Sequence, residues 1–157
     1  MLAVLLLPAL LQALLMFGDE FVYHRRRGLP LWERLGHPLD TLSVAACYGF
    51  LCVASPSHPR ALAGYIGLCA FSCLFITKDE FIHSRLCEPF ENWLHALLFV
   101  LHPIVFLAFG WAWFTGYGAF LVRGALLSTL SLLVYQLVYW NVWRTDESKP
   151  RLMEDAE

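Results

Sequence analysis

Two copies of an acidic, histidine-containing pattern are the part of this sequence best suited to chemistry. The first copy holds Asp19-Glu20-Phe21, His24, Glu33 and His37, and the second holds Asp79-Glu80-Phe81, His83, Glu91 and His95. Each copy contains two Glu/His pairs whose members are three or four positions apart, a spacing that puts both side chains on one face of a helix. Carboxylates and imidazoles on a shared face are ligands for metal ions.

The pattern therefore predicts a metal centre. Its predicted ligands are Glu20, His24, Glu33, His37, Glu80, His83, Glu91 and His95. So many ligands favour two metal ions over one four-coordinate zinc, and the Glu80/His83 spacing is similar to the Glu-x-x-His ligand pattern of di-iron and di-manganese helix bundles. Carboxylate with imidazole favours iron, with manganese or zinc as alternatives. Haem is disfavoured, because an acid beside every histidine would crowd its axial positions.

Four further residues are predicted as additional ligands or as groups that orient the ligands: Asp19, Asp40, Asp79 and His102. The aspartates Asp19 and Asp79 precede Glu20 and Glu80, so either member of each acidic pair is a candidate ligand. His102 follows His95 by seven residues, on the same helix face and about 10 Å deeper by helical rise. Weaker candidates are Tyr23, Tyr135, Gln136 and Tyr139, because tyrosine near a membrane boundary is usually an interface residue.

Arginines near the first copy give the acids an alternative role. Arg25, Arg26 and Arg27 directly follow His24, and an ion-pair collar with the acids would need no metal. The recurrence of histidine with acid in both copies favours the metal, because neutral imidazole gains little from an ion pair. The three arginines are then candidates for binding the headgroup of a lipid-like substrate.

The composition indicates an integral membrane protein. Of 157 residues, 59% are hydrophobic and only 15% are charged, and the mean hydropathy is +0.57. The net charge of -2 says little about partners, and no basic surface remains for nucleic acid once the membrane topology has used the arginines. Five cysteines, four of them in apolar segments, suggest no disulfide framework.

The elements that must position the ligands are five apolar stretches, each long enough to cross the bilayer as a helix. They cover residues 1–17, 38–54, 61–77, 93–114 and 119–140. Short links predict an up-down arrangement in which the first four form an antiparallel bundle of two repeated hairpins. The sequence thus predicts one all-α transmembrane domain over residues 1–143 and a polar tail over residues 144–157. Its parts are a first repeat over about 1–55, a second over about 60–115 and an extra helix over about 119–143.

Basic residues predict the orientation. Nine of the eleven lysines and arginines fall in the first link, the third link and the tail, which places these segments in the cytoplasm and the N-terminus outside. All eight predicted ligands then lie at the cytoplasmic face. Compact size and short loops favour a bacterial inner membrane.

These observations together predict an oxidoreductase in which two metal ions act on a lipid-like or hydrophobic substrate. An external electron donor is needed, because the sequence has no flavin or nicotinamide motif. The alternatives are a metal-ion carrier or sensor, a zinc-dependent lipid hydrolase, and a subunit whose repeated charges dock a partner.

Overall fold

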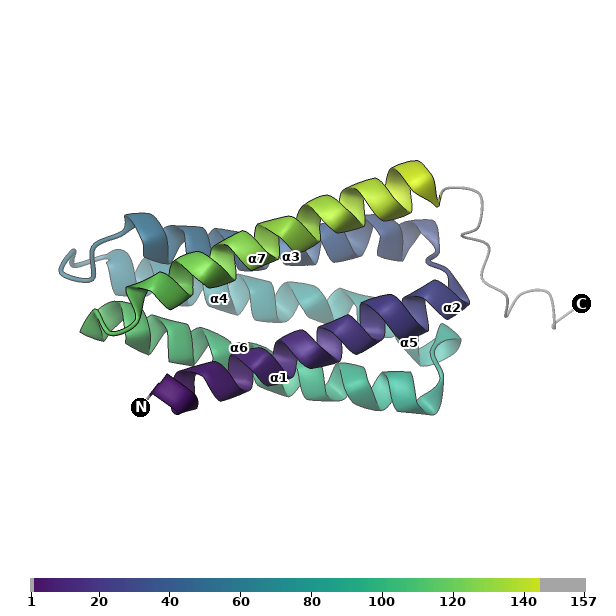
Figure 1. Cartoon of the computed structure of the whole chain (residues 1–157), viewed down its shortest axis with the longest axis horizontal. Coiled ribbons are helices and arrows are strands. Elements are labelled where there is room, and N and C mark those ends of the chain that lie inside the picture. Colours follow the sequence, from purple (N-terminus) through teal and green to yellow (C-terminus); the bar gives the residue numbers. More distant parts are fainter. Residues whose placement is uncertain (1, 145–157) are drawn as a thin grey trace, which may run out of the picture.

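The chain is mainly helical and free of strands over residues 2–144, the part that this computed structural model describes. The long helices are α1 (Leu2–Gly18), α3 (Leu31–Val53), α4 (Ala61–Phe75), α6 (Pro89–Thr115) and α7 (Ala119–Val138) (Figure 1). Shorter elements continue or connect them: η1 (Asp19–His24), α2 (Arg25–Arg27), η2 (Ile76–Asp79), α5 (Glu80–Leu86) and η3 (Tyr139–Trp143). The predicted polar tail lies outside the described residues, apart from Arg144.

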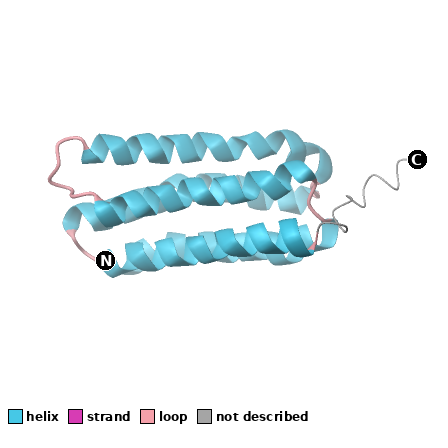
Figure 2. Ribbon diagram, turned by 90° about the horizontal axis from the view of Figure 1, so that it is seen from above, coloured by secondary structure: helices cyan, strands magenta, loops and turns pink. Residues whose placement is uncertain are grey.

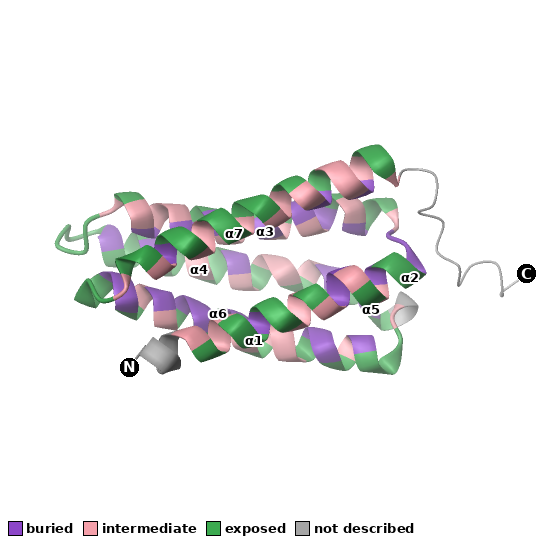
Figure 3. Cartoon of the chain, viewed as in Figure 1, coloured by how far each residue is buried: buried purple, intermediate pink, exposed green. Residues whose placement is uncertain are grey.

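Four helical segments are long and apolar enough to cross a membrane. They cover Leu6–Arg27, Ala61–Asp79, Pro89–Thr115 and Ala119–Trp143. Helix α3 is not among them, and its first half carries Glu33, His37 and Asp40. The outward faces of the bundle are exposed and rich in leucine and phenylalanine (Figure 3). The predicted all-helical membrane class is confirmed with four candidate spans, whereas the fifth span and the repeated antiparallel hairpins stay predictions.

Proline and glycine set several helix boundaries. Pro89 occupies the first position of α6, and the preceding Glu88 is extended, as expected before proline. Gly116 ends the same helix with a φ of 69°, and Gly118 precedes α7 with a φ of 79°. Both angles lie in the left-handed region that glycine adopts without strain. The turn between α6 and α7 is therefore specified by its sequence.

The long helices pack as an arc in the order α1, α6, α4, α3 and α7. The connecting loops gather at the two ends of the bundle (Figure 2). We call the end where α1 finishes and α3 and α6 begin the ligand end, because both sequence patterns map there. Helices α1 and α7 stand at the two extremes of the arc, and the contact between them that would close it into a ring is weak.

The buried interior differs between the two ends. At the end opposite the ligand end, an apolar core forms around Tyr48, Tyr65, Phe106, Phe109 and Trp113. The Tyr65 hydroxyl donates to the Phe106 carbonyl at 2.7 Å, and the Trp113 indole donates to the Ala54 carbonyl at 2.9 Å. The buried side chains at the ligand end are mainly charged or polar instead. Packing of the apolar core thus holds together the helices whose other ends carry the buried charged and polar side chains.

Candidate metal centre

Four imidazole rings lie together at the ligand end, and each of them contacts two of the others. The rings of His83 and His95 stack with centroids 4.0 Å apart, and those of His24 and His37 stack at 4.7 Å. The ring centroids of His24 and His95 are 6.4 Å apart, and those of His37 and His83 are 6.1 Å apart. Each ring comes from a different element: η1, α3, α5 and α6. We refer to these four residues as the histidine cluster.

The imidazole nitrogens of the histidine cluster are mostly without hydrogen bonds. His24, His83 and His95 are each at most 4% exposed. Both nitrogens of each of these three rings are buried and form no hydrogen bond of good geometry within the described part of the chain, although a carboxylate oxygen lies 3.1–3.2 Å from Nε2 of each ring. A buried polar atom without a hydrogen bond costs free energy, and a bound metal ion would remove that cost.

Asp19 lies between two members of the histidine cluster. One carboxylate oxygen, Oδ2, is 3.2 Å from His24 Nε2, and the other, Oδ1, is 3.1 Å from His95 Nε2. The local helix type explains the first contact, because η1 is a π-helix, in which residues five apart share a face. The same turn keeps Glu20 near His24, with Oε2 3.5 Å from Nδ1. Both acids of the Asp19-Glu20 pair therefore reach the cluster.

Among the described residues, three sets of side chains could each hold a metal ion. They are Glu20, His24 and His37; Asp19, His24, Glu91 and His95; and His83, Cys87 and His95. Within each set the ligand atoms lie within 4.8 Å of one another, and metal–ligand bonds of about 2.0–2.3 Å need only small adjustments from there. Neighbouring sets share a histidine, so the three sites form one continuous cluster.

The first of these sets is fixed by α7 and η3. Glu20 accepts hydrogen bonds from the Trp140 indole and, at 3.4 Å, from the Gln136 amide. The Gln136 carbonyl oxygen accepts a bond from Thr41 at 2.7 Å. The extra helix predicted from the sequence thus contributes the groups that orient Glu20. The sequence marks Gln136 only as a weaker candidate and does not mark Trp140, because amide and indole side chains in an apolar helix carry no ligand signal.

Glu33 and Glu91 share a buried arginine. Arg27 donates to both oxygens of Glu33, at 2.8 and 3.3 Å, and to Glu91 at 3.2 Å. Glu33 also lies 3.1 Å from His83 Nε2. Burial raises the pKa of Glu33, but the adjacent His83 and Arg27 outweigh burial and hold the pKa below its usual range. Part of the predicted ion-pair collar is therefore present, and it sits beside the histidine cluster.

The other two arginines differ from Arg27. Arg25 and Arg26 are exposed, and the Arg25 guanidinium lies 4.8 Å from the centre of the Tyr139 ring. Arg27 is 9% exposed and engaged by carboxylates. Of the three predicted headgroup ligands, Arg25 and Arg26 are thus the two that remain accessible from outside.

The second acidic pair is split by exposure. Asp79 is buried, whereas Glu80 is exposed. Lys78 Nζ lies 3.0 Å from Asp79 Oδ2 and 2.7 Å from both oxygens of Asp40. Lys78 thus pairs with both Asp40 and Asp79 and ties α3 to η2. Among the described contacts, none brings Glu80 into the histidine cluster.

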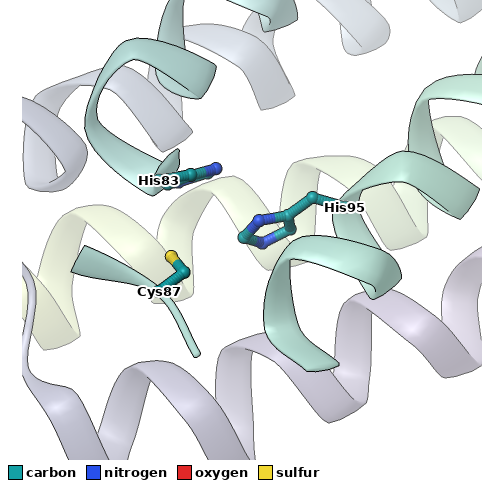
Figure 4. Close-up of side chains that lie close together, drawn as sticks. All are labelled: His83, Cys87 and His95. Carbon is teal, nitrogen blue, oxygen red and sulfur yellow. The ribbon is translucent and has the colours of Figure 1, made fainter. Parts of the chain in front are cut away.

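Cys87 is a site residue that the sequence analysis overlooked. Its thiol and the His83 and His95 rings lie close together (Figure 4). Burial raises the pKa of the Cys87 thiol, aided by the nearby Glu91, so a metal that binds there must displace a proton. The available signal was its position four residues after His83, one helical turn along the chain.

An apolar cavity of about 600 Å³ adjoins the histidine cluster. All four members of the cluster border the cavity, and His102 lines it deeper in the bundle. His102 Nε2 lies 3.1 Å from the Ser72 hydroxyl, and Nδ1 lies 3.4 Å from the Gln12 amide. The predicted additional residue His102 therefore faces the cavity rather than the metal sets.

Comparisons of the chain with protein-family models, curated proteins and solved structures find no match.

Proposed function

We propose that the protein is a membrane-embedded metalloprotein whose dinuclear centre oxidises a lipid-like or hydrophobic substrate. The observation that carries this proposal is the histidine cluster, with its buried nitrogens that lack hydrogen bonds, next to carboxylates and an apolar cavity. A metal satisfies the nitrogens, the carboxylates balance its charge, and the cavity offers a place for an apolar substrate.

Asp19 would bridge the two ions in this proposal, because its two oxygens face His24 and His95, and these histidines also belong one to each of the two other sets. Glu20, His24 and His37 bind one ion, and His83 and His95 bind the second. Glu33 acts as a positioning residue for His83, in the manner of carboxylates that orient metal-bound histidines. Within the Asp79-Glu80 pair, Asp79 is favoured over Glu80 as a candidate ligand, because it is buried.

Iron is the metal that suits this ligand set and an oxidation. Hydroxylation converts a C–H bond, O₂, two electrons and two protons into C–OH and water, and an external donor supplies the electrons. The chain's own residues exclude water from the cavity, hold the ligands and orient the histidines. Arg25 and Arg26, both exposed at the ligand end, are available to bind an anionic headgroup or the electron donor.

Cys87 favours a second candidate function. Thiolate with two imidazoles is a zinc ligand set, and zinc would activate water for the hydrolysis of a lipid ester or amide. A metal-ion carrier is less well supported, because the cavity continues from the cluster into apolar surroundings rather than along a trail of ligands.

The orientation follows from charge. We place the ligand end at the cytoplasmic face and the N-terminus outside, in a bacterial inner membrane, because the basic residues concentrate at the ligand end.

The test is spectroscopy combined with oxygen uptake. Protein purified in mild detergent is reduced with a chemical donor, and O₂ consumption is followed with and without fatty acids. We expect Mössbauer spectra of coupled iron and lipid-dependent O₂ uptake, both lost in His95→Ala and retained in the outer-loop control His58→Ala. If the protein instead contains stoichiometric zinc and takes up no O₂, the oxidase proposal is wrong and the hydrolase is favoured.

A further inference from the structure

The residues that line the cavity differ in exposure according to their helix. Lining residues from α3 and α6 are buried or half-buried. The lining residues that are exposed are Leu10, Ala13, Phe17, Phe120, Gly124 and Ser128. All six come from α1 or α7, the two extremes of the helical arc. The cavity therefore has a mouth between these two helices.

Side-chain contacts close this gap at the ligand end. Glu20 is bonded to Trp140 and Gln136, and the Phe21 and Tyr135 rings lie 5.1 Å apart. Beyond these contacts, α7 presents Gly124, and a Cβ added there would meet nothing within 4 Å. The mouth thus opens along the middle of α1 and α7, both candidate membrane spans, and faces the hydrocarbon of the bilayer.

We infer that the cavity takes up one hydrocarbon chain of a single-chain lipid, which enters sideways from the bilayer between α1 and α7. The assignment of this lipid as the substrate rests on the proposed function, while the binding of the chain does not. A water-soluble substrate would have no route through a mouth in the hydrocarbon layer, whereas a lipid chain is already dissolved there.

The size of the cavity fits a single hydrocarbon chain. A volume of 600 Å³ lies within the range of about 300–1,000 Å³ that is typical of small-molecule sites. Sites in that range hold one drug-sized ligand, and a single hydrocarbon chain is of that size.

The polar groups of the cavity give the chain a direction. Asp19, His24 and His95 border the cavity at the ligand end, whereas Val105 and Phe109 border it toward the opposite end. The polar or reactive end of the lipid therefore lies at the histidine cluster, and the hydrocarbon chain extends past the level of His102 toward the apolar core.

Photolabelling in phosphatidylcholine nanodiscs tests this inference. A long-chain fatty acid with a mid-chain diazirine is compared with a phosphatidylcholine that carries the same diazirine, and labelled residues are mapped by mass spectrometry. The variants Gly124→Trp and Ser128→Phe block the mouth. Leu127→Trp is the matched control, because Leu127 is 66% exposed on the same helix and does not line the cavity. Far-UV circular dichroism verifies the fold of each variant.

We expect the fatty acid to label inner lining residues such as Val105, and either blocking variant to reduce this labelling by about tenfold or more, with Leu127→Trp unchanged. Equal labelling of Val105 in folded blocking variants, or by the phosphatidylcholine probe, would overturn the inference. Metal content is measured on the same samples. Background metal with the expected labelling would contradict the proposed metal centre and leave the lipid site standing.

Discussion

Asp19 reaches two histidines at once because its side chain is short and its position in η1 is fixed by a π-turn. Its oxygens lie 3.2 Å from His24 Nε2 and 3.1 Å from His95 Nε2. A carboxylate between His24 and His95 can balance the positive charge of metal ions bound at either histidine, whereas an uncharged amide cannot. The proposed bridging role therefore requires an acid at this residue.

Replacement of Asp19 by asparagine should reduce bound metal. The amide keeps the size of the side chain and removes the charge that bridges two ions, so we expect metal content to fall from about two ions per chain to about one or fewer. Elemental analysis of the purified protein measures this, with Glu80→Gln as the matched control because Glu80 is exposed. Equal metal content in Asp19→Asn and in the wild-type protein would show that Asp19 is not a metal ligand.

Arg27 should be a major source of stability. Its guanidinium is bonded to Glu33 and Glu91, which are 0% and 2% exposed. Arg27→Met leaves two buried carboxylates without their cation, which costs about 3–5 kcal/mol. Thermal unfolding in detergent measures the loss, and Arg26→Met, at an exposed position, should unfold like wild type. If the two variants unfold alike, the ion pairs contribute nothing to stability.

At the scale of elements, the spacing between the first aspartate and the histidine that follows it is one residue longer in the first copy than in the second. Asp19 and His24 are five residues apart in a π-helix, whereas Asp79 and His83 are four apart across η2 and α5. The sequence predicted the Glu20/His24 pair by assuming α-helical geometry throughout. It could not predict the additional Asp19–His24 contact, because hydrogen-bond register within a helix depends on tertiary packing.

A side chain at Gly110 should disrupt the packing of α6 against α4. A Cβ there would lie 2.7 Å from the Tyr65 ring, and Tyr65 is held by its bond to the Phe106 carbonyl. Gly110→Ala should destabilise the protein by about 1–3 kcal/mol through overpacking. Gly67→Ala, where a Cβ meets nothing within 4 Å, should be neutral or slightly stabilising. Thermal unfolding of both variants makes the comparison, and equal melting temperatures would contradict it.

At the scale of the whole molecule, the bundle has an apolar half that packs and a polar half that gathers the candidate ligands. Four of the five spans and the level of the histidines were predictable, because continuous apolar runs specify spans and short links bring their ends together. The partners of the acids were not. Whether Glu33 meets a metal or Arg27, and whether Asp79 or Glu80 is buried, depends on helix rotation that spacing alone does not specify.

The orientation in the membrane has a direct test. Basic residues at the ligand end predict a cytoplasmic C-terminus. Fusion of the full chain to green fluorescent protein at the C-terminus should give fluorescent bacterial cells, and fusion to alkaline phosphatase should give inactive enzyme. The opposite pair of results would place the histidine cluster at the outer face.

The most direct test of the account is the metal stoichiometry of the full chain purified anaerobically in mild detergent. Elemental analysis should find about two ions per chain, iron first among them, and the His24→Ala/His95→Ala double variant should retain almost none, because these two residues link all three ligand sets. Background metal in the wild-type protein, or the same metal content in the folded double variant, would contradict the account.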